Sequence, residues 1–107
     1  MSTRYEITCG LDTNGHDVDA NQIARDLAAE IFPDGHTIIE ATGRYLMRST
    51  GEVIDEPTLI VVWMATDAQK GNGEAHAKVN AFARAFKNQA FQESVMITTQ
   101  DVYAVFA

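Results

Sequence analysis

Four charged residues of this 107-residue chain are spaced so that they could act together. Arg4 and Glu6 are two residues apart, and Glu40 and Arg44 are four apart, so each pair shares one face of an extended strand. Acids and bases gathered on a sheet can bind a small polar ligand or hold a general acid or base. A salt-bridged network supporting an interface uses the same residue types, and we favour that interpretation. The sequence thus gives Arg4, Glu6, Glu40 and Arg44 as a candidate ligand site and no catalytic residue.

The loop Asp12–Asp19 comes nearest to a metal site. Its carboxylates and amide alternate as in calcium loops, but Gly15 falls at position four instead of six and Ile23 stands where the bidentate acid belongs. The three histidines lie in different expected elements and lack the spacing of zinc ligands. Cys9 is the single cysteine and falls on the apolar side of a predicted strand, where a thiol is normally inert packing. We therefore expect no metal and no cofactor.

The charge balance disfavours nucleic acid and membranes as partners. The chain carries 15 acidic and 8 basic residues, whereas binding to phosphate backbones or anionic lipid needs clustered Lys and Arg. Gly71-Asn72-Gly73 precedes a predicted helix but lacks the Lys and Ser or Thr of a phosphate-binding loop. No apolar run approaches the roughly 20 residues of a membrane helix. We expect a cytoplasmic protein, and the lone cysteine fits a reducing compartment.

The elements that position these residues are organised around the run 58–64. It is uncharged and rich in Val, Ile and Trp, which is typical of a strand buried on both faces. Before it, the sequence predicts a strand near 4–11, a helix capped by Asp19 with Gln22 completing a capping box, and a strand near 36–47. After it come a glycine-rich mobile connection at 67–73 and a helix from Glu74. The chain closes with strand pieces at 95–97 and 102–106, which are broken at 98–101 by a bulge or a turn.

This order predicts a single domain over residues 1–107. A β-α-β-β-α-β succession is typical of the α+β ferredoxin-like sandwich, an antiparallel sheet with both helices on one face and the first and third strands central. The composition, with 46% hydrophobic residues, is ordinary for a globular domain of this length.

The same residues resemble a family of small bacterial and phage proteins of unknown function. The resemblance rests on landmarks that occur in order along nearly the whole chain: Arg4-Tyr5-Glu6-Ile7, Gly10, Phe32-Pro33-Asp34-Gly35-His36-Thr37, Gly43, Gly51, Glu56-Pro57 and Gln92-Glu93-Ser94-Val95. The second-strand position where many relatives carry Trp is Tyr45 here. The resemblance implies a ferredoxin-like fold and no established activity, so it assigns no catalytic residue.

One face of such a sheet is left without helices, which predicts self-association. The central strand sends Ile60, Val62 and Met64 to one side, and we expect these to form a homodimer interface that Tyr103, Val105 and Phe106 extend. Trp63, on the other side, is expected to fill the core beneath the helices.

Two function classes stay open. The first is a non-enzymatic binding or assembly module, of the kind a phage or mobile element could direct against a host protein. The second is a small cofactor-free enzyme, an isomerase or oxygenase on a dimeric ferredoxin-like scaffold. A concave pocket lined by titratable groups would favour the enzyme.

Overall fold

The computed structural model describes residues 1–46, 48–71 and 73–105. Along this part of the chain, strands and helices succeed one another in the following order: β1 (Ser2–Gly10), α1 (Ala20–Ile31), β2 (Thr37–Leu46), β3 (Val53–Ala65), α2 (Asp67–Gly71), α3 (Glu74–Gln89) and β4 (Met96–Val102). The strands form one sheet in the order β2-β3-β1-β4, and every neighbouring pair is antiparallel. The α+β ferredoxin-like fold is confirmed, with β1 and β3 in its centre.

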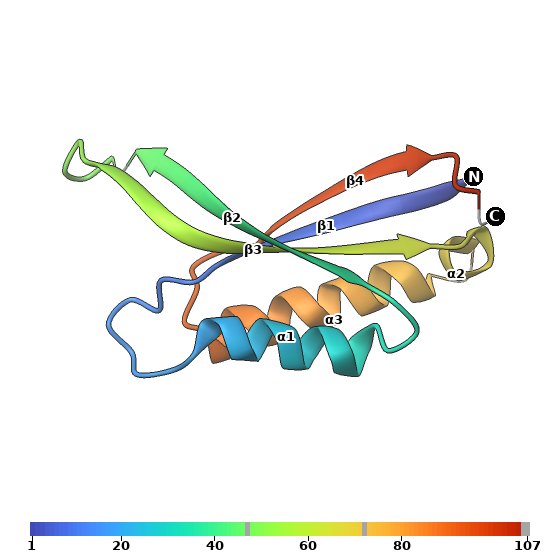
Figure 1. Ribbon diagram of the computed structural model, residues 1–107, viewed down its shortest axis with the longest axis horizontal. Helices are drawn as coiled ribbons and strands as arrows, with labels where there is room; N and C mark the ends of the chain where they lie inside the picture. Colours follow the sequence, from blue (N-terminus) through green and yellow to red (C-terminus); the bar gives the residue numbers. More distant parts are fainter. Residues whose placement is uncertain (47, 72, 106–107) are drawn as a thin grey trace.

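The long helices α1 and α3 lie side by side beneath the sheet, and none of the helices formed by the described residues covers its other face (Figure 1). The tip of the β2–β3 hairpin projects past the ends of β1 and β4. Among the described residues, no helix is long and apolar enough to cross a membrane.

The core lies between the sheet and the two long helices. Leu59, Val61 and Trp63 of β3 point into it and are almost entirely buried, as their alternation along the strand predicts. The ring of Trp63 stacks on Phe32, with ring centroids 4.7 Å apart, which confirms that Trp63 fills the space beneath the helices. Phe82 of α3 also stacks on Phe32, with ring centroids 5.8 Å apart. Each such buried side chain stabilises the fold by roughly 1.5–3 kcal/mol.

Asp19 caps α1 as expected, because its Oδ1 accepts a hydrogen bond from the backbone N–H of Gln22 at 3.0 Å. The second half of the predicted capping box is not formed. The Gln22 side chain instead donates to Asp26, one turn further along the helix. The helix ends at Ile31, directly before Phe32 and Pro33, where proline prevents its continuation.

Two local predictions are corrected. The connection expected to be mobile contains a short helix, α2, which begins where Thr66 and Gln69 exchange hydrogen bonds across its first turn. The expected break at 98–101 is absent, since β4 runs continuously from Met96 to Val102. Its polar residues are compatible with a strand because β4 is an edge strand whose partner β1 supplies the pairing.

The register divides the residues of the sheet between two faces. We call the uncovered side the open face. It consists of residues 2, 4, 6, 8 and 10 of β1, residues 37, 39, 41, 43 and 45 of β2, residues 54, 56, 58, 60, 62 and 64 of β3, and residues 96, 98, 100 and 102 of β4. Arg4, Glu6 and Glu56 are its three charged members.

Candidate functional site

The four charged residues that the sequence groups together lie on two different faces. Arg4 and Glu6 are on the open face, where the Arg4 Nη2 and Nε donate to Glu6 Oε1 at 2.9 and 3.1 Å. This pair borders a shallow hollow of about 240 Å³ with Thr98 and Gln100 of β4. A contact between neighbouring, partly exposed residues of one strand adds little to stability.

Glu40 and Arg44 point to the helix side of the sheet. Glu40 pairs in register with the core residue Leu59, and its carboxylate accepts from Arg25 of α1 at 3.1 Å. Arg44 lies further along the projecting hairpin and donates to Asp55 at 2.7 Å and 3.1 Å. This hydrogen bonding raises the pKa of the Arg44 guanidinium. The structure therefore pairs each of these residues locally and does not bring the four together.

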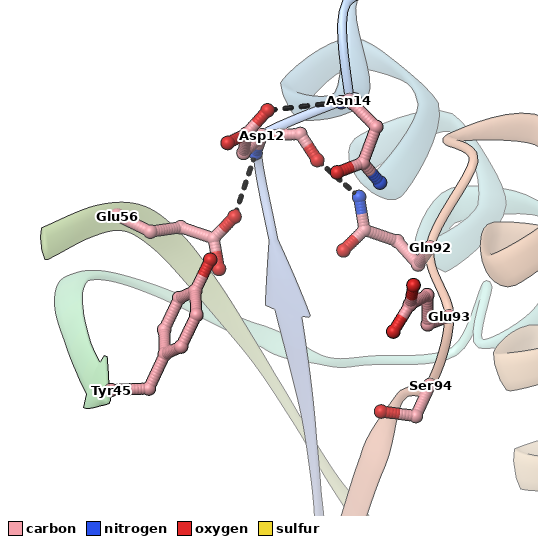
Figure 2. Close-up of a pocket in the computed structure, with 7 residues that line it drawn as sticks. All are labelled: Asp12, Asn14, Tyr45, Glu56, Gln92, Glu93 and Ser94. Carbon is pink, nitrogen blue, oxygen red and sulfur yellow. Dashed lines mark hydrogen bonds between the residues drawn. The ribbon is translucent and has the colours of Figure 1, made fainter. Parts of the chain in front are cut away.

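A different group of polar residues meets around a hollow of about 280 Å³ at the corner where the hairpin leaves the sheet. We call it the corner hollow. Figure 2 shows its lining: Asp12 and Asn14 from the loop after β1, Tyr45 from β2, Glu56 from β3, and Gln92, Glu93 and Ser94 from the connection before β4. Four separate segments of the chain supply these side chains.

Glu56 is held at the floor of the corner hollow by the end of β1. Its Oε2 accepts the backbone N–H of Asp12 at 3.0 Å (Figure 2). Its carboxylate also lies against Gly10, where an added Cβ would fall only 2.6 Å from Oε1. Glycine at this position thus lets the carboxylate approach the strand. Pro57, the next residue, accepts from the Leu11 N–H at 3.0 Å, which fixes the backbone beside it.

The opposite wall is tied to the same loop. The Gln92 side chain donates to the backbone oxygen of Asp12 (Figure 2), and the Asn14 side chain donates to the backbone oxygen of Phe91 at 2.7 Å. The Phe91 ring stacks on His16 with centroids 3.6 Å apart and planes 6° apart. These contacts join the loop after β1 to the segment before β4, so both walls are positioned without a ligand.

The lining gives the corner hollow a definite chemical character. Asp12, Glu56 and Glu93 supply carboxylates, and no Lys or Arg is among the lining residues. The hydroxyl-bearing ring of Tyr45 is exposed, and Asn14, Gln92 and Ser94 add neutral donors and acceptors. Such a lining suits a cation that also carries hydrogen-bonding groups.

Three of the residues predicted to form an interface, Ile60, Val62 and Met64, lie on the open face, where the alternation places them. Ile60 and Met64 are partly exposed, whereas Val62 is only 7% exposed because the flanking strands already surround it. Tyr103 and Val105 follow β4 and are 86% and 70% exposed. Phe106 lies outside the described residues. The interface role of all six stays a prediction.

Cys9 does not line any of these hollows. It is buried in the core on the helix side of β1, and burial raises the pKa of its thiol to about 12. Within the described part of the chain, no three His, Cys, Asp or Glu side chains are grouped so that they could hold a metal ion.

Sequence reasoning did not identify the corner hollow as a site, although several of its residues carry the family resemblance. Glu56 and the run Gln92-Glu93-Ser94 are among those landmarks, Tyr45 occupies the position where relatives have Trp, and Gly10 makes room for Glu56. The signal that the sequence offered was the recurrence of polar landmarks in separate segments, and only the folded chain shows that they meet at one corner.

The chain belongs to the family described as "Protein of unknown function (DUF3574)", whose model matches residues 4–106. No curated protein matches the sequence.

Solved structures share its fold. A phage SAM lyase in complex with S-methyl-5'-thioadenosine aligns with a TM-score of 0.71 and 18% identity, covering 99% of this chain and 90% of the other. A phage SAM lyase in its apo state aligns with a TM-score of 0.63 and 20% sequence identity, covering 98% of this chain and 89% of the other. The divalent cation tolerance protein Cut A1 of Thermus thermophilus aligns with a TM-score of 0.60 and 14% sequence identity, covering 99% of this chain and 88% of the other. At these identities the likeness shows the fold alone.

Proposed function

We propose that this protein is a small-molecule-binding module and that the corner hollow holds a small organic cation. The observation that carries the proposal is the meeting of Asp12, Glu56 and Glu93 around one hollow whose lining includes no basic residue. The whole protein has a net charge of −7, so the negative charges of the lining lie in a field of the same sign. The electrostatic potential in the corner hollow therefore favours a cation.

An organic cation fits this lining better than a metal ion. The carboxylates are distributed around the walls, and among the described residues no group of three ligating side chains is close enough for a metal. A larger ligand could contact all three carboxylates at once. The exposed ring of Tyr45 offers an aromatic face to a cation or a heterocycle, an interaction that contributes about 0.5–1 kcal/mol at exposed sites. The volume, about 280 Å³, is near the lower end for small-molecule sites.

The structural likeness to a SAM lyase suggests which cation to try first. S-adenosylmethionine combines a positively charged sulfonium with amino, hydroxyl and ring nitrogen groups. Its demethylated form, S-adenosylhomocysteine, has a neutral sulfur and otherwise the same groups. The pair therefore isolates the contribution of the charge. S-methyl-5'-thioadenosine is the matching neutral fragment.

Isothermal titration calorimetry with these three compounds tests the proposal. We expect S-adenosylmethionine to bind at least about tenfold more tightly than S-adenosylhomocysteine, and salt to weaken that preference. Glu56→Gln keeps an oxygen acceptor for the Asp12 N–H and removes one of the three charges, so it should weaken the preference. Glu30→Gln, on the exposed side of α1, removes the same charge elsewhere and should leave the preference intact.

Three results would contradict the proposal. Equal affinities for the charged and neutral compounds would show that charge does not govern binding. Equal effects of Glu56→Gln and Glu30→Gln would show that binding depends on overall charge. If the amide NMR signals of Asp12 and Gln92 respond neither to S-adenosylmethionine nor to simpler cations such as choline at millimolar concentration, the corner hollow is not the site.

A second candidate is an enzyme that cleaves such a ligand, and the likeness to a SAM lyase favours it. A sulfonium C–S bond can break with its electron pair passing to sulfur, which becomes a neutral thioether. A carboxylate takes a proton from the adjacent carbon at the same time, and the electrons of that C–H bond form a carbon–carbon double bond in the departing chain. Asp12, Glu56 and Glu93 are the carboxylates that line the corner hollow and could take that proton. Formation of S-methyl-5'-thioadenosine from S-adenosylmethionine, followed by chromatography, would show that the protein is an enzyme. Binding of S-adenosylmethionine without this product would show that it is a binding module.

Phage or mobile-element origin, a host protein as partner, and the absence of nucleic-acid binding are proposals here. The phage source of two similar structures is compatible with the first of these.

A further inference from the structure

We propose that the open face binds the open face of a second copy of this chain, so that the working protein is a two-fold dimer or is built from such pairs. The inference is independent of ligand binding in the corner hollow. It starts from the sheet, whose one side is covered by α1 and α3 and whose other side has no covering element among the described residues (Figure 1).

A mostly apolar row, in which Thr8 is the polar member, crosses the open face from edge to edge. The register aligns Ile39 of β2, Ile60 of β3, Thr8 of β1 and Met96 of β4 as successive neighbours. Ile39 is 39% exposed and Met96 59% exposed. Exposed apolar residues gathered in one row mark an interaction surface more often than isolated apolar residues do.

The charge of the open face indicates which partner fits. The protein carries a net charge of −7, so two copies repel one another through most of their surface. On the open face, Arg4 and Glu6 neutralise each other at 2.9 Å, and the third charge, Glu56, lines the corner hollow at the margin of the open face. The centre of the open face is therefore the place where two copies can approach without like charges meeting.

The Arg4–Glu6 pair also makes the open face complementary to itself. In a two-fold interface the same patch serves both partners, so a positive group beside a negative one can meet its opposite on the other copy. Two antiparallel sheets pack face to face with their strands within about 30° of each other, a geometry that stacks one apolar row over the other. A basic partner would instead be drawn to the acidic remainder of the surface, and an apolar partner would leave the Arg4–Glu6 pair without water.

Light scattering after size exclusion, across micromolar concentrations, gives the first test. A mass of 11.8 kDa, that of the single chain, would overturn the proposal. The expected mass is that of two chains or of a whole number of such pairs. Met96→Glu should then raise the dissociation constant at least about a hundredfold, because the two-fold axis brings two new like charges into the interface.

Val53→Glu is the matched control. Val53 is a strand residue that is also 59% exposed, but it pairs with Leu46 on the side of the hairpin away from the open face. It should leave the dissociation constant unchanged. Equal effects of the two substitutions, or no effect of Met96→Glu on an oligomer, would overturn the proposal.

The charge argument has its own test. Arg4→Glu places two acids side by side on each open face and should dissociate the pair, while the double variant Arg4→Glu with Glu6→Arg restores neutrality and should restore association. Circular dichroism checks that each variant is folded. If Met96→Glu unfolds, Ile39→Glu on the opposite edge strand takes its place. Failure of the double variant to recover would overturn the assigned role of this pair.

Discussion

Replacing Gly10 by alanine should separate the geometry of the corner hollow from the stability of the fold. A Cβ at this position would fall 2.6 Å from Oε1 and 2.9 Å from Cδ of Glu56. Real atoms do not approach so closely, so the Glu56 side chain must turn away. Gly10 is outside the left-handed backbone region, and alanine can therefore adopt its conformation. We expect the strand to stay intact while the carboxylate leaves its place.

The expected change in stability is small because two effects oppose each other. Alanine in place of glycine at a compatible position stabilises by about 0.4–1 kcal/mol, since it restricts the unfolded chain. Losing the hydrogen bond from the Asp12 N–H to Glu56 costs about 0.5–1.5 kcal/mol, and the bond is exposed, which puts the loss at the lower end. The free energy of unfolding should therefore remain within about 1 kcal/mol of the parent protein.

Two measurements on the same variant check this reasoning. Urea unfolding gives the change in stability, and NMR amide exchange at Asp12 reports its hydrogen bond, which should exchange about tenfold or more faster if its acceptor is displaced. Gly71→Ala is the control, since no atom lies within 4 Å of a Cβ built there. That variant should not alter the Asp12 amide.

A loss of more than about 2 kcal/mol would show that Glu56 cannot move and that the clash is absorbed by the strand itself. An unchanged Asp12 amide would show that the carboxylate keeps its acceptor role beside a methyl group. Either result would refute the account of Gly10 as the residue that makes room for Glu56.

Three further predictions concern the cap, the thiol and the loop. Asp19→Ala should lower the free energy of unfolding by about 1 kcal/mol in urea titrations, because the Gln22 N–H loses its acceptor, whereas Asp17→Ala in the same loop should not. Burial raises the pKa of the Cys9 thiol to about 12, so the contribution of the neutral thiol to stability should be full below its pKa in the unfolded chain, near 8.5, and be lost as the pH rises toward 12. The native protein should therefore resist iodoacetamide at pH 9, and rapid alkylation would contradict this. Millimolar calcium or EDTA should leave the melting temperature unchanged, since a micromolar site would add about 4 kcal/mol.

The fold was largely predictable because its signals are local. The run 58–64 has the composition of a buried strand, and Asp19 and Pro33 bracket α1 through chemistry that acts within one turn. β4 was divided wrongly because Thr98, Gln100 and Asp101 look like turn residues when read alone. Their compatibility with a strand depends on the pairing with β1, which is not a local property.

The site was less predictable because it depends on register. Alternation placed Glu40 and Arg44 on one face of β2, as observed, but nothing in β2 alone tells which face of the sheet that is. The pairing of Glu40 with Leu59 turns it toward the helices, and its place near the sheet edge lets the carboxylate reach water and Arg25. The corner hollow needed still more information, since its walls come from four segments that only the folded chain brings together.

The two proposals meet at two residues. Tyr45 and Glu56 line the corner hollow and also belong to the open face, so a second copy packed on that face would lie beside the ligand site. If association changes the affinity for the ligand by some factor, the ligand must change the association constant by the same factor, because binding free energies are coupled reciprocally. The hairpin that carries Tyr45 projects beyond the rest of the sheet (Figure 1). It is therefore the element that both the ligand and the second copy would contact. A shorter hairpin would alter the wall of the corner hollow and the margin of the open face together, so shortening it should affect both ligand binding and association if the two proposals hold.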